Sequence, residues 1–593
     1  MGGGPTTLHT YLRFFRRMSL LGAACLLAAA CGGAGGQQSQ SLSSSQTLKF
    51  PIFDNFGSLD PDQLNAESDS EIAQNVFNGL VKFDSNLNVV PDIATSLPKV
   101  SADGLTYTFT LRKDVTFSNG DKVSAKDVLY SWNRGAALAG PYSTSLGAIA
   151  GFDTVSTNGK KVADPAKLET MLDAKDPSVA MTGLTAPDGP DGYTVQVKLA
   201  QSAGWFLSAI ALESTTGMLV DQNAVKKDPA KWWSKPETAI GTGAYKMTGY
   251  VEKQSADFQA VPNWWGSPKP VVKKVHIDII SNPGTGVTAY EQGKYDLMGF
   301  GGYSSAVPIA DLLRIRNNPK EKAQLLIRPK VRSYWVSFNV VSDAKRKAKG
   351  PFVGETADAK NLRLAFALAV DKQKLAQVVC QNIVCTPATG GLIPPGLVGY
   401  LGDNQDPLAK FDPQKAKQLL KQADPDGSKT RGLAYVYDPE SALNSQSAQF
   451  LQDQWQTNLG VHVDLTPETH SQFIKDRQAG NFVLSRDGWQ ADYNHPQDWF
   501  DNLWGKAAGC PDSACTSGYD SPAYDEAVAK ADSLPLSQAV PQYKKISQML
   551  IDEANYIPLF YAQGTFLIKP YVKGAGSNAF SDYWWNNYQI LQH

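Results

Sequence analysis

After residue 30 the sequence contains no long hydrophobic run, and it carries little net charge. A membrane-spanning helix needs about 20 consecutive apolar residues, so we expect the body of the protein to be soluble. The 56 basic residues nearly balance the 57 acidic ones, and no basic patch or arginine run occurs. These absences argue against nucleic acid and anionic lipid as ligands.

Motifs of metal binding and catalysis are also missing. None of the six histidines stands three or four residues from another, which excludes a helical zinc pair. Gly241-Thr242-Gly243 lacks the third glycine of a dinucleotide-binding loop, and neither GxxxxGK[ST] nor GxSxG occurs. A catalytic carboxylate pair stays open, because the acidic residues offer many combinations. We therefore expect a protein that is not an enzyme and that holds neither metal nor other cofactor.

The first thirty residues are typical of an export signal rather than of a folded segment. Arg13, Arg16 and Arg17 form a positive region, and the apolar run from Met18 to Ala30 follows it. That run is too short to span a bilayer and indicates a signal-peptide core. We assign residues 1–30 to a signal peptide.

Cys31 follows three alanines and precedes two glycines, which resembles a bacterial lipobox, although Ala28 stands where such boxes usually carry Leu. We predict that Cys31 is diacylated, because two acyl chains suffice to hold a protein at a membrane. The alternatives are an ordinary cleaved secretory signal and a lipobox at Cys25, whose preceding residues fit less well. Residues 32–46 carry no charge and almost no apolar side chain, so 31–46 form the lipidated cysteine and a flexible tether.

Four later cysteines occur in two close pairs, Cys380 with Cys385 and Cys510 with Cys515. In an exported protein such local pairs are most simply disulfides that close small loops. A metal site is the alternative, although no histidine stands at ligand spacing from either pair.

The remaining chain, roughly 545 residues, is too long for one core and indicates two or three domains. Leu105–Leu111 alternates apolar residues with threonines, which predicts a half-buried strand. Ser124 to Asp127 predicts a capping box at a helix start, and Asp412-Pro413 predicts a second start. Leu362–Val379 predicts another helix, interrupted near Asp371. The fold class is therefore mixed α/β.

Four segments that occur in order along the chain resemble one family. They are Asn75–Trp132, Gly241–Tyr245 with Asn263–Gly266, Leu362–Asp371 and Phe482–Leu503. Their patterns are similar to those of the family 5 extracellular solute-binding proteins of ABC importers, the peptide/nickel/opine class. The resemblance implies a two-lobed clamshell of the periplasmic-binding-protein type with an extra domain, which closes over its ligand by hinge motion.

The resemblance also implies a division of the mature chain into three domains, with the ligand between domains I and III. The predicted boundaries are 47–85, 206–328 and 560–593 for domain I, 86–205 for domain II, and 329–559 for domain III.

Within the family the chain is most similar to oligopeptide-binding proteins. In GWQADYNHP, Asp492 falls where those proteins hold an aspartate that grips the peptide α-ammonium through charge-assisted hydrogen bonds. Arg477 and Arg486 fall where they hold two arginines that meet the peptide carboxylate. Trp489 fits a pocket wall. Without the resemblance, a surface aspartate, surface ion pairs and a core tryptophan would be the ordinary interpretations.

Further residues follow from the same resemblance. Tyr142, Trp335 and Phe300 fall near aromatic residues of the binding cleft. The segment from Asn65 to Glu67 falls on a strand edge whose backbone could pair with an extended peptide. At each of these positions a purely structural role is the alternative.

The chain also departs from these relatives. Gln490 and Arg332 occupy the two positions at which the relatives carry a cysteine bridge. His470 stands where they carry a cleft tryptophan, so one side-chain pocket must differ.

The sequence thus predicts a monomeric substrate-binding lipoprotein that captures oligopeptides and delivers them to an ABC permease. We expect it at the outer face of the cytoplasmic membrane or in the periplasm. The alternative keeps the transport role but takes an oligosaccharide, opine, haem or nickel chelate as ligand. An extracellular enzyme on the same scaffold is a third interpretation, which the missing catalytic motifs disfavour.

Overall fold

The computed structural model describes residues 41–593, except 54–56, 65, 163, 213–216, 301–306, 341–349, 509, 511–516, 520, 577 and 581–583. Residues 42–593 form one compact unit. The predicted signal peptide, Cys31 and all but the last six residues of the tether lie outside the described residues. Within the described ranges, no helix has both the length and the apolar character needed to cross a bilayer.

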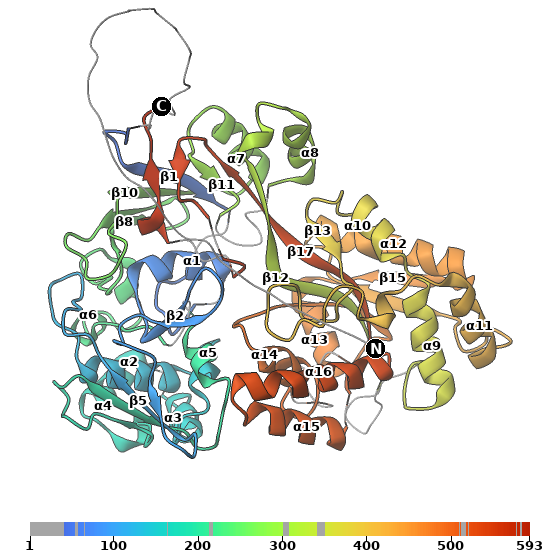
Figure 1. Ribbon diagram of the computed structural model, residues 1–593, viewed down its shortest axis with the longest axis horizontal. Helices are drawn as coiled ribbons and strands as arrows, with labels where there is room; N and C mark the ends of the chain where they lie inside the picture. The colour runs from blue at the N-terminus through green and yellow to red at the C-terminus, as the bar shows by residue number, and fades with distance from the viewer. Residues whose placement is uncertain are drawn as a thin grey trace, which may run out of the picture. The chain divides into compact units, whose positions relative to one another are not determined.

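The first sheet has four strands in the order β1-β10-β9-β8, with β1 parallel to β10. Helix α1 (Glu67–Val76) lies beside it (Figure 1). Near the C-terminus, the ring of Trp585 lies 5.3 Å from the ring of Phe258 on β9. The strands are β1 (Thr47–Ile52), β8 (Tyr245–Val251), β9 (Ser255–Ala260) and β10 (Lys274–Ile279).

The second sheet has the order β4-β5-β7-β6. Its strand β5 (Thr106–Thr110) buries alternate residues, which confirms the predicted half-buried strand. Helix α2 (Ala125–Leu138) begins after Ser124, whose N–H donates to the Asp127 carboxylate at 2.8 Å, as the capping box predicts. The other strands are β4 (Lys99–Val100), β6 (Leu184–Thr185) and β7 (Thr194–Lys198).

The third sheet has the order β11-β17-β12-β16-β14-β15, with β13 paired to β17. Its two long strands β12 and β17 run antiparallel and side by side (Figure 1). Their register shifts after Pro329, which has no N–H to donate to the ladder. The strands are β11 (Leu297–Met298), β12 (Leu325–Phe338), β13 (Cys385–Pro387), β14 (Leu433–Tyr437), β15 (Val463–Pro467), β16 (Leu484–Gln490) and β17 (Tyr556–Ile568).

Helices accompany the third sheet, and two of the sequence predictions concern them. The helix predicted for Leu362–Val379 breaks where expected, because Asp371 caps the N-terminus of a second helix. Asp412 caps the helix that begins with Pro413. The helices are α9 (Ala357–Leu368), α10 (Lys372–Val378), α11 (Pro413–Ala423), α12 (Ala442–Leu459), α13 (His470–Ala479), α14 (Gln497–Leu503), α15 (Pro522–Asp532) and α16 (Leu536–Asp552).

Shorter elements connect these parts. Two small antiparallel pairs are β2 (Val81–Phe83) with β3 (Val89–Pro91), and β18 (Val572–Lys573) with β19 (Gln589–Ile590). The remaining α-helices are α3 (Phe152–Gly159), α4 (Pro165–Asp173), α5 (Phe206–Ile210), α6 (Gln222–Val225), α7 (Pro283–Glu291) and α8 (Ile309–Asn317).

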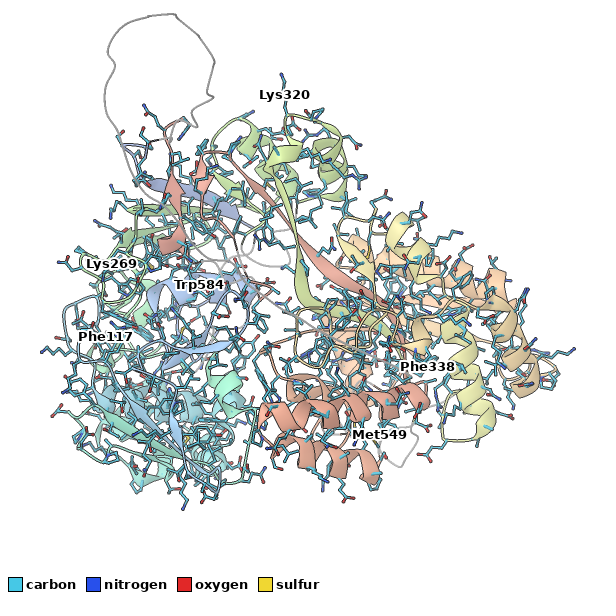
Figure 2. The ribbon with its side chains drawn as sticks, in the orientation of Figure 1. Phe117, Lys269, Lys320, Phe338, Met549 and Trp584 are labelled. Carbon is cyan, nitrogen blue, oxygen red and sulfur yellow. A yellow bond between two sulfur atoms is a disulfide. The ribbon has the colours of Figure 1, made fainter. Side chains whose placement is uncertain are left out.

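Two large apolar cores hold the fold. One is shared by the first and second sheets, and the other lies against the third sheet. In the second core Phe338 ends β12 as a fully buried side chain, whereas Met549 packs at its margin from α16 (Figure 2). The division into domains I to III stays a prediction, and β17 crosses its proposed boundary at residue 560.

The predicted disulfide between Cys380 and Cys385 is confirmed, with an S–S distance of 2.05 Å. Cys510 is also disulfide-bonded, and Cys515 lies outside the described residues.

Candidate functional site

Three of the predicted ligand residues, Arg486, Trp489 and Asp492, lie on strand β16 or directly after it. β16 lies between β12 and β14, and in its register with β12, Arg486 stands opposite Val336 and Trp489 opposite Ser333. The loop that carries Asp492 follows directly and leads into α14. The ladder with β12 runs along the whole of β16, while β14 pairs only with Leu484 and Ser485, and this pairing fixes the directions of the side chains.

Asp492 is half-buried, and its carboxylate forms neither a hydrogen bond nor an ion pair with another described residue. Its backbone N–H donates to Asp498 Oδ2 at 3.0 Å. Loss of hydration by burial raises the pKa of Asp492 to about 7. A carboxylate in such a place is a ready acceptor for an ammonium group, since the charge-assisted hydrogen bond would restore what burial removed.

Asp498 is fully buried and was missed by the sequence analysis. Its Oδ2 also accepts from Trp489 Nε1 at 3.1 Å, and its Oδ1 accepts from Asn502 Nδ2 at 3.1 Å. Burial, and secondly the charge of Asp492, raise the pKa of Asp498. One carboxylate therefore fixes both the ring of Trp489 and the backbone of Asp492. The only sequence feature that could have indicated Asp498 is its position as a second acidic residue, six residues after Asp492.

Tyr142 lies on a different part of the chain, immediately before a short 3₁₀ turn over Ser143–Leu146. It is half-buried. Burial raises the pKa of Tyr142, and the negative charge of Asp492 is the next largest cause. The fold thus brings Tyr142 within electrostatic range of Asp492, although some 350 residues separate them in sequence.

Arg477, on α13, is already paired inside the protein. Its Nη1 lies 2.6 Å from Oδ1 of Asp487, a fully buried residue of β16. The second oxygen of Asp487 accepts from Ser337 Oγ at 2.9 Å. The Nε–H of Arg477 is buried and has no hydrogen-bond acceptor. The guanidinium therefore has its charge balanced but keeps one donor unused.

Arg486 is also paired with an acid, through an ion pair and not a hydrogen bond. Its Nη2 lies 3.1 Å from Oδ2 of Asp438, whose side chain is 3% exposed. The guanidinium also lies over the rings of Tyr334 and Phe473, at 5.8 and 5.7 Å. Its Nε–H is buried without an acceptor. Arg477 and Arg486 thus each keep a buried Nε–H group that an oxygen atom of a ligand could accept from.

Trp335 and Phe300, predicted near the cleft, lie inside the protein. Trp335 is 0% exposed, its ring lies 5.6 Å from that of Trp504, and its Nε1 donates to Ser337 Oγ at 3.0 Å. Phe300 is 2% exposed and lies 5.0 Å from the ring of Phe566. Both side chains belong to the apolar cores and present almost no surface to a ligand in this structure.

Glu67 begins α1, and its Oε1 lies 2.8 Å from Lys330 Nζ of β12. Asn65, the other end of the predicted strand edge, lies outside the described residues. Because Ala66 is the N-cap of α1 and Glu67 is helical, the predicted strand edge is wrong at these two residues, and the backbone pairing with a peptide stays a prediction.

The two residues that replace the relatives' cysteine bridge are direct neighbours. Arg332 on β12 stands opposite Gln490 on β16 in the antiparallel register. The guanidinium of Arg332 lies 5.0 Å from the ring of Tyr334.

A further grouping escaped the search for metal motifs. Asp438, Glu440 and His470 place one ligand atom each within 4.8 Å of one another. His470 is the first residue of α13, so the fold and not the sequence spacing unites the three. The guanidinium of Arg486 already compensates the charge of Asp438, which weakens the case for a cation there.

Known proteins of similar sequence and structure complete this description. Residues 88–509 match the bacterial extracellular solute-binding proteins, family 5 Middle. The chain is 26% identical over 567 residues to the periplasmic oligopeptide-binding protein OppA of Escherichia coli K12, covering 93% of this chain and 94% of OppA.

Solved structures share the fold over nearly the whole chain. The E. coli murein tripeptide-binding protein MppA matches with a TM-score of 0.69 at 24% identity, covering 93% of this chain and 100% of MppA. Haemophilus influenzae OppA, solved in complex with RPPGFSPFR, matches with a TM-score of 0.67 at 24% identity and the same coverage. The fold is therefore that of a periplasmic binding protein. Because the family match spans more than half of the sequence, the chain belongs to the family 5 extracellular solute-binding proteins.

Proposed function

We propose that this protein captures short peptides outside the cytoplasmic membrane and delivers them to an ABC permease. The observation that carries the proposal is the carboxylate of Asp492, which is half-buried yet accepts nothing from any other described residue. An isolated carboxylate in such surroundings is costly unless a ligand compensates it, and a peptide α-ammonium has the required charge and donors.

The opposite end of the proposed site has complementary chemistry. Arg477 and Arg486 each hold one buried Nε–H donor without an acceptor, and each has its net charge balanced by an aspartate. A peptide carboxylate or backbone carbonyl would satisfy these donors. The amine end therefore supplies charge recognition, and the carboxylate end supplies mainly hydrogen bonds.

This asymmetry favours a ligand with a free amino group over a neutral sugar. The relatives support the same assignment, because OppA of E. coli is an oligopeptide-binding protein and that of H. influenzae was solved with a nonapeptide. Oligosaccharide, opine, haem and nickel chelate are the alternatives that an experiment must exclude.

The proposal includes the setting of the protein. We infer a monomer that is anchored through a diacylated Cys31, acts at the outer face of the cytoplasmic membrane or in the periplasm, and performs no catalysis. The ligand would lie between predicted domains I and III, where Glu67 and Lys330 already form a contact.

The most informative experiment identifies what the protein carries through purification. Mass spectrometry of the ligand released by denaturation should detect peptides, and calorimetry with a mixed library of tri- to pentapeptides should give saturable binding. Peptides with an acetylated N-terminus should bind much more weakly than those with an amidated C-terminus. A protein that ignores the peptide library and binds cello- or manno-oligosaccharides would contradict the proposal.

A further inference from the structure

We propose that Asp498 is the positioning residue of the amine-binding end, and that it places the proton of a carboxylate pair on Asp492 until a ligand arrives. The inference rests on the proposed function, because it assigns Asp492 to the ligand's ammonium group. It adds a residue that touches no ligand and a proton that leaves the protein on binding.

The hydrogen bonds of Asp498 carry the positioning role. Its two oxygens accept three N–H groups, from the indole of Trp489, the backbone of Asp492 and the amide of Asn502, at 3.0–3.1 Å. The first two donors belong to residues that we place at the ligand. Loss of the Asp498 carboxylate would leave both N–H groups without an acceptor and release the loop that presents Asp492.

The same hydrogen bonds decide where the charge lies. Burial raises the pKa of both Asp492 and Asp498, and the charge of Asp492 raises that of Asp498 further, so the pair resists carrying two negative charges at once. Three N–H donors stabilise an ionised Asp498, whereas Asp492 has none among the described residues. In the free protein the negative charge therefore lies on Asp498 and the proton on Asp492.

Ligand binding removes the proton from Asp492. An incoming ammonium group stabilises the ionised carboxylate, so the Asp492 O–H bond breaks and its proton passes to the buffer while the ligand keeps its three N–H bonds. No other group changes charge in this step. The free energy of binding then depends on pH, because the proton must be removed before the ion pair forms.

Other titratable groups surround the pair, and their charge states are compatible with this step. The pKa values of Tyr142 and Tyr493 are raised by burial, so both stay neutral, and burial lowers the pKa of His495 to about 3, so it is neutral as well. Three residues after Asp498 along α14, Asp501 forms a second acidic pair with Asp532, and Tyr543 donates to Asp532. This second pair provides a matched control.

The test compares the wild type with Asp498→Asn, which removes the charge but keeps an acceptor for Trp489 and Asp492. Peptide binding is followed by calorimetry at pH 6, 7 and 8 in buffers of different ionisation enthalpy. The wild type should release up to one proton per ligand below pH 7, and its affinity should fall about fourfold from pH 8 to pH 6, because the ligand's amine, with a pKa of about 8, is itself partly neutral at pH 8. In Asp498→Asn the proton release and this pH dependence should be smaller than in the wild type, because the repulsion from Asp498 is gone while the burial of Asp492 remains, and affinity at pH 8 should stay within about threefold of the wild type.

Two further variants separate positioning from charge. Asp498→Ala should weaken binding at least tenfold at pH 8, whereas Asp532→Asn should leave both the pH dependence and the proton release unchanged. If Asp498→Asn releases as many protons as the wild type, the inference is wrong although the proposed function stands. If the wild type binds no peptide in the same titration, the proposed function itself fails.

Discussion

The guanidinium of Arg477 lies 2.6 Å from the carboxylate of Asp487, which is fully buried and held on its other oxygen by Ser337. A residue that we assign to ligand binding is thus also the counter-ion of a core acid. Removal of Arg477 disturbs the fold and the site together, so substitutions must be chosen to separate the two effects.

We expect Arg477→Ala to lower the free energy of unfolding by about 3 kcal/mol, because it leaves Asp487 as an uncompensated buried charge. Arg477→Lys keeps the charge and should cost less than about 1.5 kcal/mol. Urea denaturation of both variants provides the measurement. Equal stability of Arg477→Ala and wild type would show that the pair does not stabilise the fold.

The same lysine variant tests the carboxylate end. Arg477→Lys has no Nε–H in the place of the arginine donor, so it should weaken a free-acid peptide several-fold more than the corresponding C-terminal amide. Calorimetry with the two peptides gives the ratio. An equal loss for both would mean that Arg477 does not meet the peptide carboxylate.

Asp492→Ala should weaken the binding of tri- to pentapeptides by roughly 2–4 kcal/mol, since the ligand's ammonium would be buried without a partner. Its effect on stability should be small, because the Asp492 carboxylate has no partner among the described residues to lose. Calorimetry measures the affinity and thermal unfolding the stability. Unchanged affinity would show that Asp492 does not bind the ligand.

The burial of His495 should make the free energy of unfolding depend on pH in the acidic range. His495 is 2% exposed, its Nδ1 accepts from the Gln497 N–H at 3.2 Å, and burial lowers its pKa to about 3. The ordinary pKa of histidine is about 6.5. Below that pH, His495 is therefore protonated in the unfolded chain but stays neutral in the folded protein. Stability from this group is therefore lost as the pH falls from about 6.5 towards 3, by up to about 1.4 kcal/mol per pH unit.

The check is urea denaturation at pH 4, 5, 6 and 7 of the wild type and His495→Gln, which cannot titrate. The variant should show the shallower dependence on pH. Parallel curves for the two proteins would assign the acid sensitivity to other groups.

The disulfide between Cys380 and Cys385 should contribute modestly, because it closes a loop with a sequence separation of only 5 residues. Chain-entropy arguments give about 2 kcal/mol for a loop of this size. The double variant Cys380→Ser, Cys385→Ser should unfold at correspondingly lower urea concentration and keep its peptide affinity. A loss of binding in this variant would place the loop in the site.

Local features were predictable because their causes lie within a few residues. The capping box of Ser124 with Asp127, the N-caps at Asp371 and Asp412 and the alternation along β5 follow from neighbouring side chains alone. The disulfide between Cys380 and Cys385 belongs to the same class.

The electrostatics of the site were not predictable, because they depend on sheet register. The sequence gives no sign that Arg486 meets Asp438, which lies on another strand's end, or that Asp487 faces Arg477. An aromatic residue in a strand has the same pattern in a core and in a cleft, so the burial of Trp335 required the structure.

Arg332 and Gln490 face each other across two strands, at the two positions where the resemblance to oligopeptide-binding proteins implies a cysteine bridge. Their strands are joined by a backbone ladder, which no thiol reagent can cut. The end of the sheet that leads to Asp492 should therefore keep its geometry when the surroundings turn from oxidising to reducing. Reduction would then act on the disulfide between Cys380 and Cys385 and on the one that includes Cys510, but not on the link between these two strands.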